Sequence, residues 1–82
     1  MNNWVVYLLK CADGSFYCGV TNDMKKRLVK HNEGKASKFT RGRLPVKLAV
    51  ISQLLTKSEA MRNEYKIKQL PKKEKRKAVK SI

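Results

Sequence analysis

Two β-prone runs flank an Asp-Gly turn near the start of the chain, Trp4-Val5-Val6-Tyr7-Leu8-Leu9 and Ser15-Phe16-Tyr17-Cys18-Gly19-Val20. This pattern predicts an antiparallel hairpin. A two-residue loop at Asp13-Gly14 would put Tyr7 and Tyr17 on opposite faces. A three-residue loop that begins at Ala12, with a left-handed glycine in a bulge, would put both tyrosines on one face. We favour the longer loop, because the other face then carries a credible core layer of Trp4, Val6, Leu8, Phe16, Cys18 and Val20.

The middle of the chain predicts a helix, a loop and a strand. Thr21 or Asn22 can cap a helix over residues 23–32, and Gly34 lies just past its end. We expect residues 34–45 to form a basic loop. The apolar residues between positions 46 and 54 predict a third strand.

Two further helices are expected towards the C-terminus. The sequence Thr56-Lys57-Ser58-Glu59 is a capping box, which opens a helix that should run to about Gln69. Pro71 suits the first position of a short basic third helix. The order ββ-α-β-α-α predicts an α+β fold, in which a three-stranded antiparallel sheet is flanked by helices.

Charge and length narrow the class of protein. The 82 residues include 20 Lys or Arg against 6 Asp or Glu, which gives a net charge of +14. We expect one domain over residues 1–82, with a basic helix or tail from about residue 71. No apolar run approaches the roughly 18 residues of a membrane span, and no secretory signal is visible, so we expect a cytoplasmic protein. The charge favours a polyanionic partner, with nucleic acid first among them and a merely solvated surface as the alternative.

The two cysteines are expected to be small core residues. Cys11 and Cys18 are too few for a disulfide scaffold, and thiols stay reduced in the cytosol. Their spacing, with a single histidine in the chain, fits no common zinc site.

Glu64 interrupts an apolar stripe on the second predicted helix, where it lies between Ala60 and Ile67. A carboxylate at such a position needs a partner. One interpretation is an ion pair with a lysine or arginine. The other is a ligand for Mg²⁺ or Mn²⁺, with water and phosphate oxygens completing the coordination shell.

Four more residues are candidates for chemistry. Tyr7 and Tyr17 could serve only for aromatic packing. Alternatively, one of them could accept a proton from water, if nearby cations favour its phenolate. Arg27 could be a surface charge, or it could stabilise the extra charge on an attacked phosphate. His31 lies one helical turn from Arg27, and it could orient a water molecule or protonate a leaving group.

An ordered set of motifs resembles the GIY-YIG nuclease superfamily, in particular its small single-domain bacterial members. Val5-Val6-Tyr7 precedes Tyr17-Cys18-Gly19 as the paired signature of that superfamily. The likeness covers nearly the whole chain. It continues through Thr21-Asn22, Arg27, His31, Lys38-Phe39-Thr40-Arg41-Gly42-Arg43, Pro45-Val46-Lys47-Leu48, Ser58-Glu59-Ala60 and Glu64-Tyr65-Lys66-Ile67-Lys68-Gln69-Leu70. Val5-Val6-Tyr7 replaces the Gly-Ile-Tyr of the family signature, and Val20 occupies the position where the repair-nuclease branch has a lysine.

The resemblance implies metal-dependent hydrolysis of a phosphodiester. Glu64 would hold Mg²⁺ or Mn²⁺, Arg27 would contact the attacked phosphate, and a tyrosine would accept the proton of the attacking water. Relatives differ over which tyrosine does this, so both remain candidates, with Tyr17 slightly favoured. Gly19 would let the backbone approach the substrate closely.

We therefore expect a DNA endonuclease of low sequence specificity, which is specific for a DNA structure or acts in repair. Eight residues are expected to grip the nucleic acid, with Phe39 stacking on a base. They are Lys35, Lys38, Phe39, Arg41, Arg43, Lys72, Lys73 and Arg76. The rival is a nucleic-acid-binding module with little turnover, and a third reading is an RNA-associated basic protein.

Overall fold

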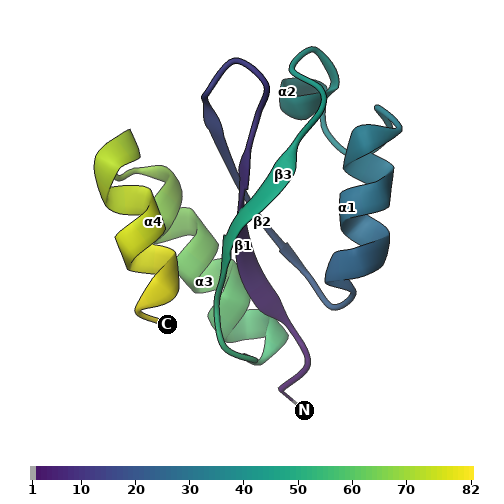
Figure 1. The fold of residues 1–82 in the computed structure, drawn as a ribbon. Coiled ribbons are helices and arrows are strands. Elements are labelled where there is room, and N and C mark those ends of the chain that lie inside the picture. The colour runs from purple at the N-terminus through teal and green to yellow at the C-terminus, as the bar shows by residue number, and fades with distance from the viewer. Residues whose placement is uncertain (1) are drawn as a thin grey trace.

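The computed structural model describes residues 2–82, which form an antiparallel sheet between two pairs of helices (Figure 1). The strands are β1 (Val5–Lys10), β2 (Phe16–Thr21) and β3 (Lys47–Ile51), in the order β2-β1-β3. The helices are α1 (Met24–Asn32), α2 (Lys38–Arg41), α3 (Lys57–Lys68) and α4 (Lys72–Lys80). In Figure 1, α3 and α4 cover one face of the sheet, and α1 and α2 lie on the other side. The predicted α+β architecture is confirmed.

The hairpin has the three-residue loop that the apolar pattern favours. In the antiparallel pairing of β1 with β2, Tyr7 lies opposite Gly19 and Leu9 lies opposite Tyr17. The Cys11 amide donates to the carbonyl of residue 15 at 2.8 Å, which closes the loop around residues 12–14. Residue 14, a glycine, has a φ of 86°, which side chains rarely adopt. Both tyrosines therefore project from the same face of the sheet.

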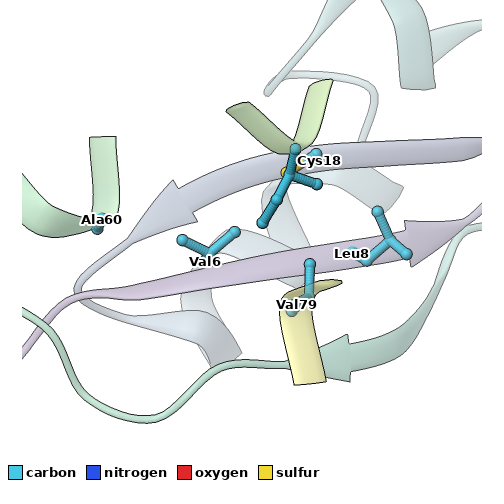
Figure 2. Close-up of a cluster of buried hydrophobic side chains, with 6 residues drawn as sticks. Val6, Leu8, Cys18, Ala60 and Val79 are labelled. Atoms are coloured by element: carbon cyan, nitrogen blue, oxygen red, sulfur yellow. The ribbon is translucent and has the colours of Figure 1, made fainter. Parts of the chain in front are cut away.

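The face covered by α3 and α4 holds the predicted apolar layer. Figure 2 shows Val6, Leu8 and Cys18 of the sheet beside Ala60 of α3 and Val79 of α4. The remaining members of the predicted layer, Trp4, Phe16 and Val20, are partly buried and pack against this cluster. Both cysteines are buried and reduced, in agreement with their prediction as core residues.

The tyrosine face is a second core, where the sequence analysis assigned only one. Its buried apolar members are Tyr7, Leu9, Cys11 and Val46. Side chains of α1, including Met24 and Leu28, pack against them. The central strand β1 is thus covered on both faces, which explains why its sequence is continuously apolar rather than alternating.

Several predicted boundaries are corrected by local hydrogen bonds. Asp23 caps α1 in place of Thr21 or Asn22, because its carboxylate accepts from the Lys26 amide at 3.1 Å. Pro71 precedes α4 as its cap and is not its first residue. The third strand is shorter than predicted, and it shifts register where β1 passes from Leu8 to Leu9.

The expected loop over residues 34–45 contains a helical turn, α2. Ser37 caps it, and its side chain accepts from the Phe39 amide at 3.1 Å. One turn is too short to show helical periodicity, so the sequence pattern could not reveal it.

Replacing Gly34 with alanine is expected to destabilise the fold. Gly34 has a φ of 76° directly after α1, and a Cβ there would meet only ordinary contacts, so the cost is conformational. We expect a loss of about 1 kcal/mol, which lowers the Tm by roughly 4–8 °C in thermal unfolding. Gly42→Ala is the matched control, because Gly42 has a negative φ and open space around it. Equal Tm values for the two variants would contradict this explanation.

Candidate functional site

Tyr7 and His31 form a buried hydrogen bond between the sheet and α1. The phenol oxygen of Tyr7 lies 2.8 Å from Nε2 of His31, and the two side chains are only 2% and 1% exposed. On the other side of the imidazole, Nδ1 lies 2.8 Å from Oγ1 of Thr40 in α2. Thr40 is itself fully buried. A continuous polar chain, the Tyr7–His31–Thr40 chain, therefore connects β1, α1 and α2.

The last hydrogen bond of this chain indicates the direction of the others. The Thr40 hydroxyl donates to the backbone carbonyl of Ser37 at 3.3 Å, and a carbonyl oxygen can only accept. Oγ1 of Thr40 must then accept from Nδ1–H of His31. That leaves a lone pair on Nε2, which accepts from the phenol of Tyr7. These directions predict a neutral His31 that carries its proton on Nδ1.

The electrostatic environment supports the same protonation states. Burial raises the pKa of Tyr7 well above its ordinary value, and the nearby Tyr17 adds to this rise. Burial, and then the positive charge of Arg27, lower the pKa of His31 from its ordinary value of 6.5. The phenol thus keeps its proton, and the imidazole stays neutral at neutral pH.

Gly19 leaves the space that the Tyr7 ring occupies. A Cβ on Gly19 would lie 2.5 Å from the Tyr7 hydroxyl oxygen and 2.6 Å from the ring carbon that carries it. The close approach of the Gly19 backbone to a substrate, which the family resemblance implies, stays a prediction. In the structure the neighbour is Tyr7, so any side chain at position 19 would displace the phenol from His31.

Tyr17 extends the aromatic cluster from the buried chain towards solvent. Its ring centroid lies 5.2 Å from that of His31, 6.4 Å from that of Tyr7 and 5.9 Å from that of Phe39. Tyr17 is half-buried, and the Lys68 ammonium lies 5.7 Å from its ring centroid. Of the two candidate tyrosines, Tyr17 is therefore the one that solvent reaches more readily.

Arg27 and Glu64 bring opposite charges to this cluster from two helices. Both act on the Tyr7 phenol, where Arg27 lowers the pKa and Glu64 raises it, after the larger effects of burial and Tyr17. Arg27 also lines a hollow of about 210 Å³ at the start of α1. Tyr7, Tyr17 and His31 are thus in contact with one another, and the charges of Arg27 and Glu64 act on the Tyr7 phenol from α1 and α3.

Glu64 forms the ion pair with a lysine that one of the two interpretations of its position expects, and it is also the one acidic residue predicted to hold a divalent ion. Its side chain is 21% exposed, and Nζ of Lys68 lies 3.4 Å from one carboxylate oxygen. Residues 2–82 contain no group of three or more His, Cys, Asp or Glu side chains that could hold a metal. The donor set is therefore a single hard oxygen ligand, which suits Mg²⁺ or Mn²⁺ whose other ligands come from water and phosphate.

Six of the residues predicted to bind nucleic acid fall into two groups. Lys35, Lys38 and Arg41 border a hollow beside α2, and Lys72, Lys73 and Arg76 border one beside α4. Phe39 is 38% exposed.

Arg43 is engaged within the protein. Its Nε donates to Asp13 at 3.0 Å, one terminal nitrogen donates to the Phe39 carbonyl at 2.7 Å, and its guanidinium lies over the Phe39 ring. It anchors the hairpin loop to α2.

The sequence predicted no role for Thr40 or for Asn32, two residues that hold α1 to its neighbours. Thr40 lies in the segment 38–43, and its contact with His31 depends on the helical turn α2, which the sequence did not predict. Asn32 was also missed. Its amide exchanges two hydrogen bonds with the backbone of Val46, of 2.8 and 3.1 Å, and ties α1 to the start of β3. No spacing signal identifies either residue, because both partners are distant in sequence.

The hydrogen-bond directions predict the tautomer of His31. In ¹⁵N NMR spectra at neutral pH we expect a protonated Nδ1 and an unprotonated Nε2. Thr40→Ser keeps the accepting hydroxyl and should preserve this pattern. Thr40→Val removes it, and should lower the tautomer preference and cost about 1–3 kcal/mol of stability. An unprotonated Nδ1 in the unmodified protein would refute the assignment.

Acidification is expected to destabilise the protein through His31. Because the folded state lowers the pKa of His31 from 6.5, the unfolded state binds the proton more tightly. The free energy of unfolding should be constant just above about pH 7 and should fall as the pH drops through about 6.5. Urea titrations at several pH values measure this, alongside an NMR titration of the imidazole. An imidazole that titrates above pH 6.5 in the folded protein would contradict the prediction.

Comparisons with known proteins find a matching family model and similar sequences. The family model described as "GIY-YIG catalytic domain" matches residues 3–77. A UPF0213 protein of Bacillus pumilus is 51% identical over 74 residues, which cover 90% of this chain and 76% of that protein. A UPF0213 protein of Halobacterium salinarum is 51% identical over 65 residues, which cover 79% and 84% respectively.

Two solved NMR structures are similar as well. Protein EF2693 from E. faecalis has a TM-score of 0.63 and 37% identity, with 99% of this chain and 90% of that chain covered. The UPF0213 protein BH0048 from Bacillus halodurans has a TM-score of 0.56 and 45% identity, with 93% of this chain and 81% of that chain covered.

No helix in residues 2–82 is long and apolar enough to cross a membrane. With a family model over most of its length and these relatives, the chain belongs to the GIY-YIG nuclease family.

Proposed function

We propose that this protein is a metal-dependent DNA endonuclease that hydrolyses phosphodiester bonds with low sequence specificity. The observation that carries the proposal is a cluster of two phenols and an imidazole, on which the charges of a guanidinium and a carboxylate act. Tyr17 and His31 lie in ring contact with Tyr7, and the charges of Arg27 and Glu64 both act on Tyr7. These groups supply a proton acceptor, a phosphate contact and a metal ligand in one place.

Each residue has a role that follows from its surroundings. Tyr17 borders solvent, and as the phenolate, after its own proton has passed to solvent, it is proposed to accept the proton of the attacking water. Arg27 stabilises the charge that develops on the attacked phosphate. Glu64 would hold Mg²⁺ or Mn²⁺, and such an ion supplies charge neutralisation at the phosphate oxygens when it is bound.

The buried Tyr7–His31–Thr40 chain is proposed to position the reacting groups. His31 is 1% exposed, so it has no direct path to a leaving group. It acts through Tyr7, whose ring it orients and whose position it fixes next to Tyr17. Orientation of this kind is a large part of catalysis when the reacting atoms must approach within about 3–3.5 Å.

Nucleic acid is the substrate that the charge supports. A net charge of +14 and two groups of cations beside α2 and α4 would neutralise backbone phosphates. Contacts of this kind position a strand without identifying its sequence, which is the reason for proposing low sequence specificity.

Replacing Glu64 tests the enzymatic proposal. With Mg²⁺ or Mn²⁺, the unmodified protein should cut at least one member of a panel of single-stranded, duplex, flap and four-way-junction DNA. We expect Glu64→Gln to reduce the cleavage rate at least about 100-fold, because loss of the metal ligand removes several kcal/mol of transition-state stabilisation. Tyr17→Phe should also reduce the rate, and DNA binding in EDTA should be largely retained by both variants.

The matched control is Glu33→Gln, which makes the same change of charge at an exposed position after α1. It should leave the cleavage rate unchanged. Cleavage that persists in EDTA, or that is indifferent to Glu64, would exclude the proposed site. Binding without any cleavage across the panel would favour a nucleic-acid-binding module, and preferred cleavage of RNA would reassign the substrate.

A further inference from the structure

Two adjoining hollows run along the β2 edge of the sheet and meet at Phe16. The first has a volume of about 510 Å³ and is lined by Phe16, Pro71, Lys72, Lys73 and Arg76. The second, of about 300 Å³, is lined by Phe16, Tyr17, Cys18, Phe39, Lys68 and Lys75. We call these two hollows together the aromatic groove. One end of the groove lies at Tyr17, in the candidate catalytic site, and the other lies at the start of α4.

Aromatic rings and cations alternate in the groove. The ammonium of Lys72 lies 5.4 Å from the centroid of the Phe16 ring, and that of Lys68 lies 5.7 Å from the centroid of Tyr17. The Tyr17 and Phe39 rings are tilted by only 30° to one another, with centroids 5.9 Å apart. The groove thus offers ring faces beside positive charges, and Arg43 covers one face of Phe39, which leaves its other face for a ligand.

The cations at the α4 end are free to pair with an external anion. Within residues 2–82, two ion pairs occur, between Arg43 and Asp13 and between Lys68 and Glu64. Neither involves Lys72, Lys73 or Arg76. A carboxylate-rich partner could satisfy these charges, but it would leave the aromatic ring faces of the groove uncovered.

We propose that the aromatic groove binds an unpaired stretch of a DNA strand, whose bases stack on Phe16 and Phe39 and whose phosphates pair with Lys72, Lys73 and Arg76. Stacking on protein rings requires exposed base faces, which a duplex hides between its own base pairs. A strand with unpaired nucleotides satisfies both the rings and the charges. The inference rests on the proposed function, because the groove leads to Tyr17. The substrate is then single-stranded next to the cleaved phosphate.

Binding of strands with identical phosphates separates the contribution of base stacking to affinity from that of phosphate charge. Fluorescence anisotropy in EDTA measures binding of an oligothymidylate of about 12 nucleotides, and of the same strand with abasic sites at its centre. We expect the oligothymidylate to bind at least about tenfold more tightly, because only it presents base faces. Duplex DNA and the matching RNA strand complete the set, and both should bind more weakly than the DNA strand at equal salt.

Phe16→Leu tests the location of the stacking. Leucine keeps apolar packing against the core but removes the ring face, so the ratio of the two affinities should fall to about threefold or less. The matched control is Tyr65→Leu, at a tyrosine that is 72% exposed and lines neither hollow. It should preserve the ratio. NMR shift mapping on the unmodified protein, with a short oligothymidylate, should move signals of Phe16 and Lys72 more than those of Val29 on α1.

Each other outcome overturns the proposal. Equal binding of intact and abasic strands would leave only phosphate contacts, and a ratio that Phe16→Leu does not change would place stacking elsewhere. Tighter binding of the RNA strand or of the duplex would exclude unpaired DNA as the occupant. Because the assay contains no metal and needs no cleavage, its result is independent of the proposed catalysis. A groove that binds as expected in a protein that never cuts DNA would refute the proposed function alone.

Discussion

The pairing register of β1 with β2 is the constraint on which the rest of the structure depends. Side chains alternate across a strand, so a shift of one residue would exchange the two faces of the hairpin. The three-residue loop sets Tyr7 opposite Gly19, the one residue beside which the phenol fits. The same register sends Val6 and Leu8 into the core below α3 and α4. One turn thus decides both the apolar packing and the composition of the site.

A second constraint is the cost of burying polar groups between the sheet and α1. Three polar side chains are nearly fully buried there, and an unpaired group among them would be expensive. The Tyr7–His31–Thr40 chain satisfies each of them, and it ends on a backbone carbonyl of the turn before α2. The basic segment after α1 is therefore held in place by the same hydrogen bonds that orient the phenol.

Much of the fold was accessible from the sequence because its signals are local. The hairpin loop, the capping box at Thr56 and Glu59 and the helix in the basic tail are all present as predicted. The errors are also local in kind. Asp23, and not the neighbouring Thr21 or Asn22, caps α1. The helix α2 is a single turn, which is too short to show helical periodicity in the sequence. The candidate site was named through a resemblance to a family, while residue types and spacing alone left Tyr7, His31 and Glu64 with structural alternatives.

The sequence by itself determined the apolar face of the hairpin that α3 and α4 cover, the order of the elements other than α2, and the excess of positive charge, because each depends on residues close together in the chain. Only the tertiary structure decided the neighbours of the reacting groups. His31 and Thr40 are nine residues apart, and Tyr7 and His31 are twenty-four apart, so their hydrogen bonds exist only after the helices pack on the sheet. The same packing set how accessible each tyrosine is, since exposure belongs to the assembled layers and not to any stretch of residues.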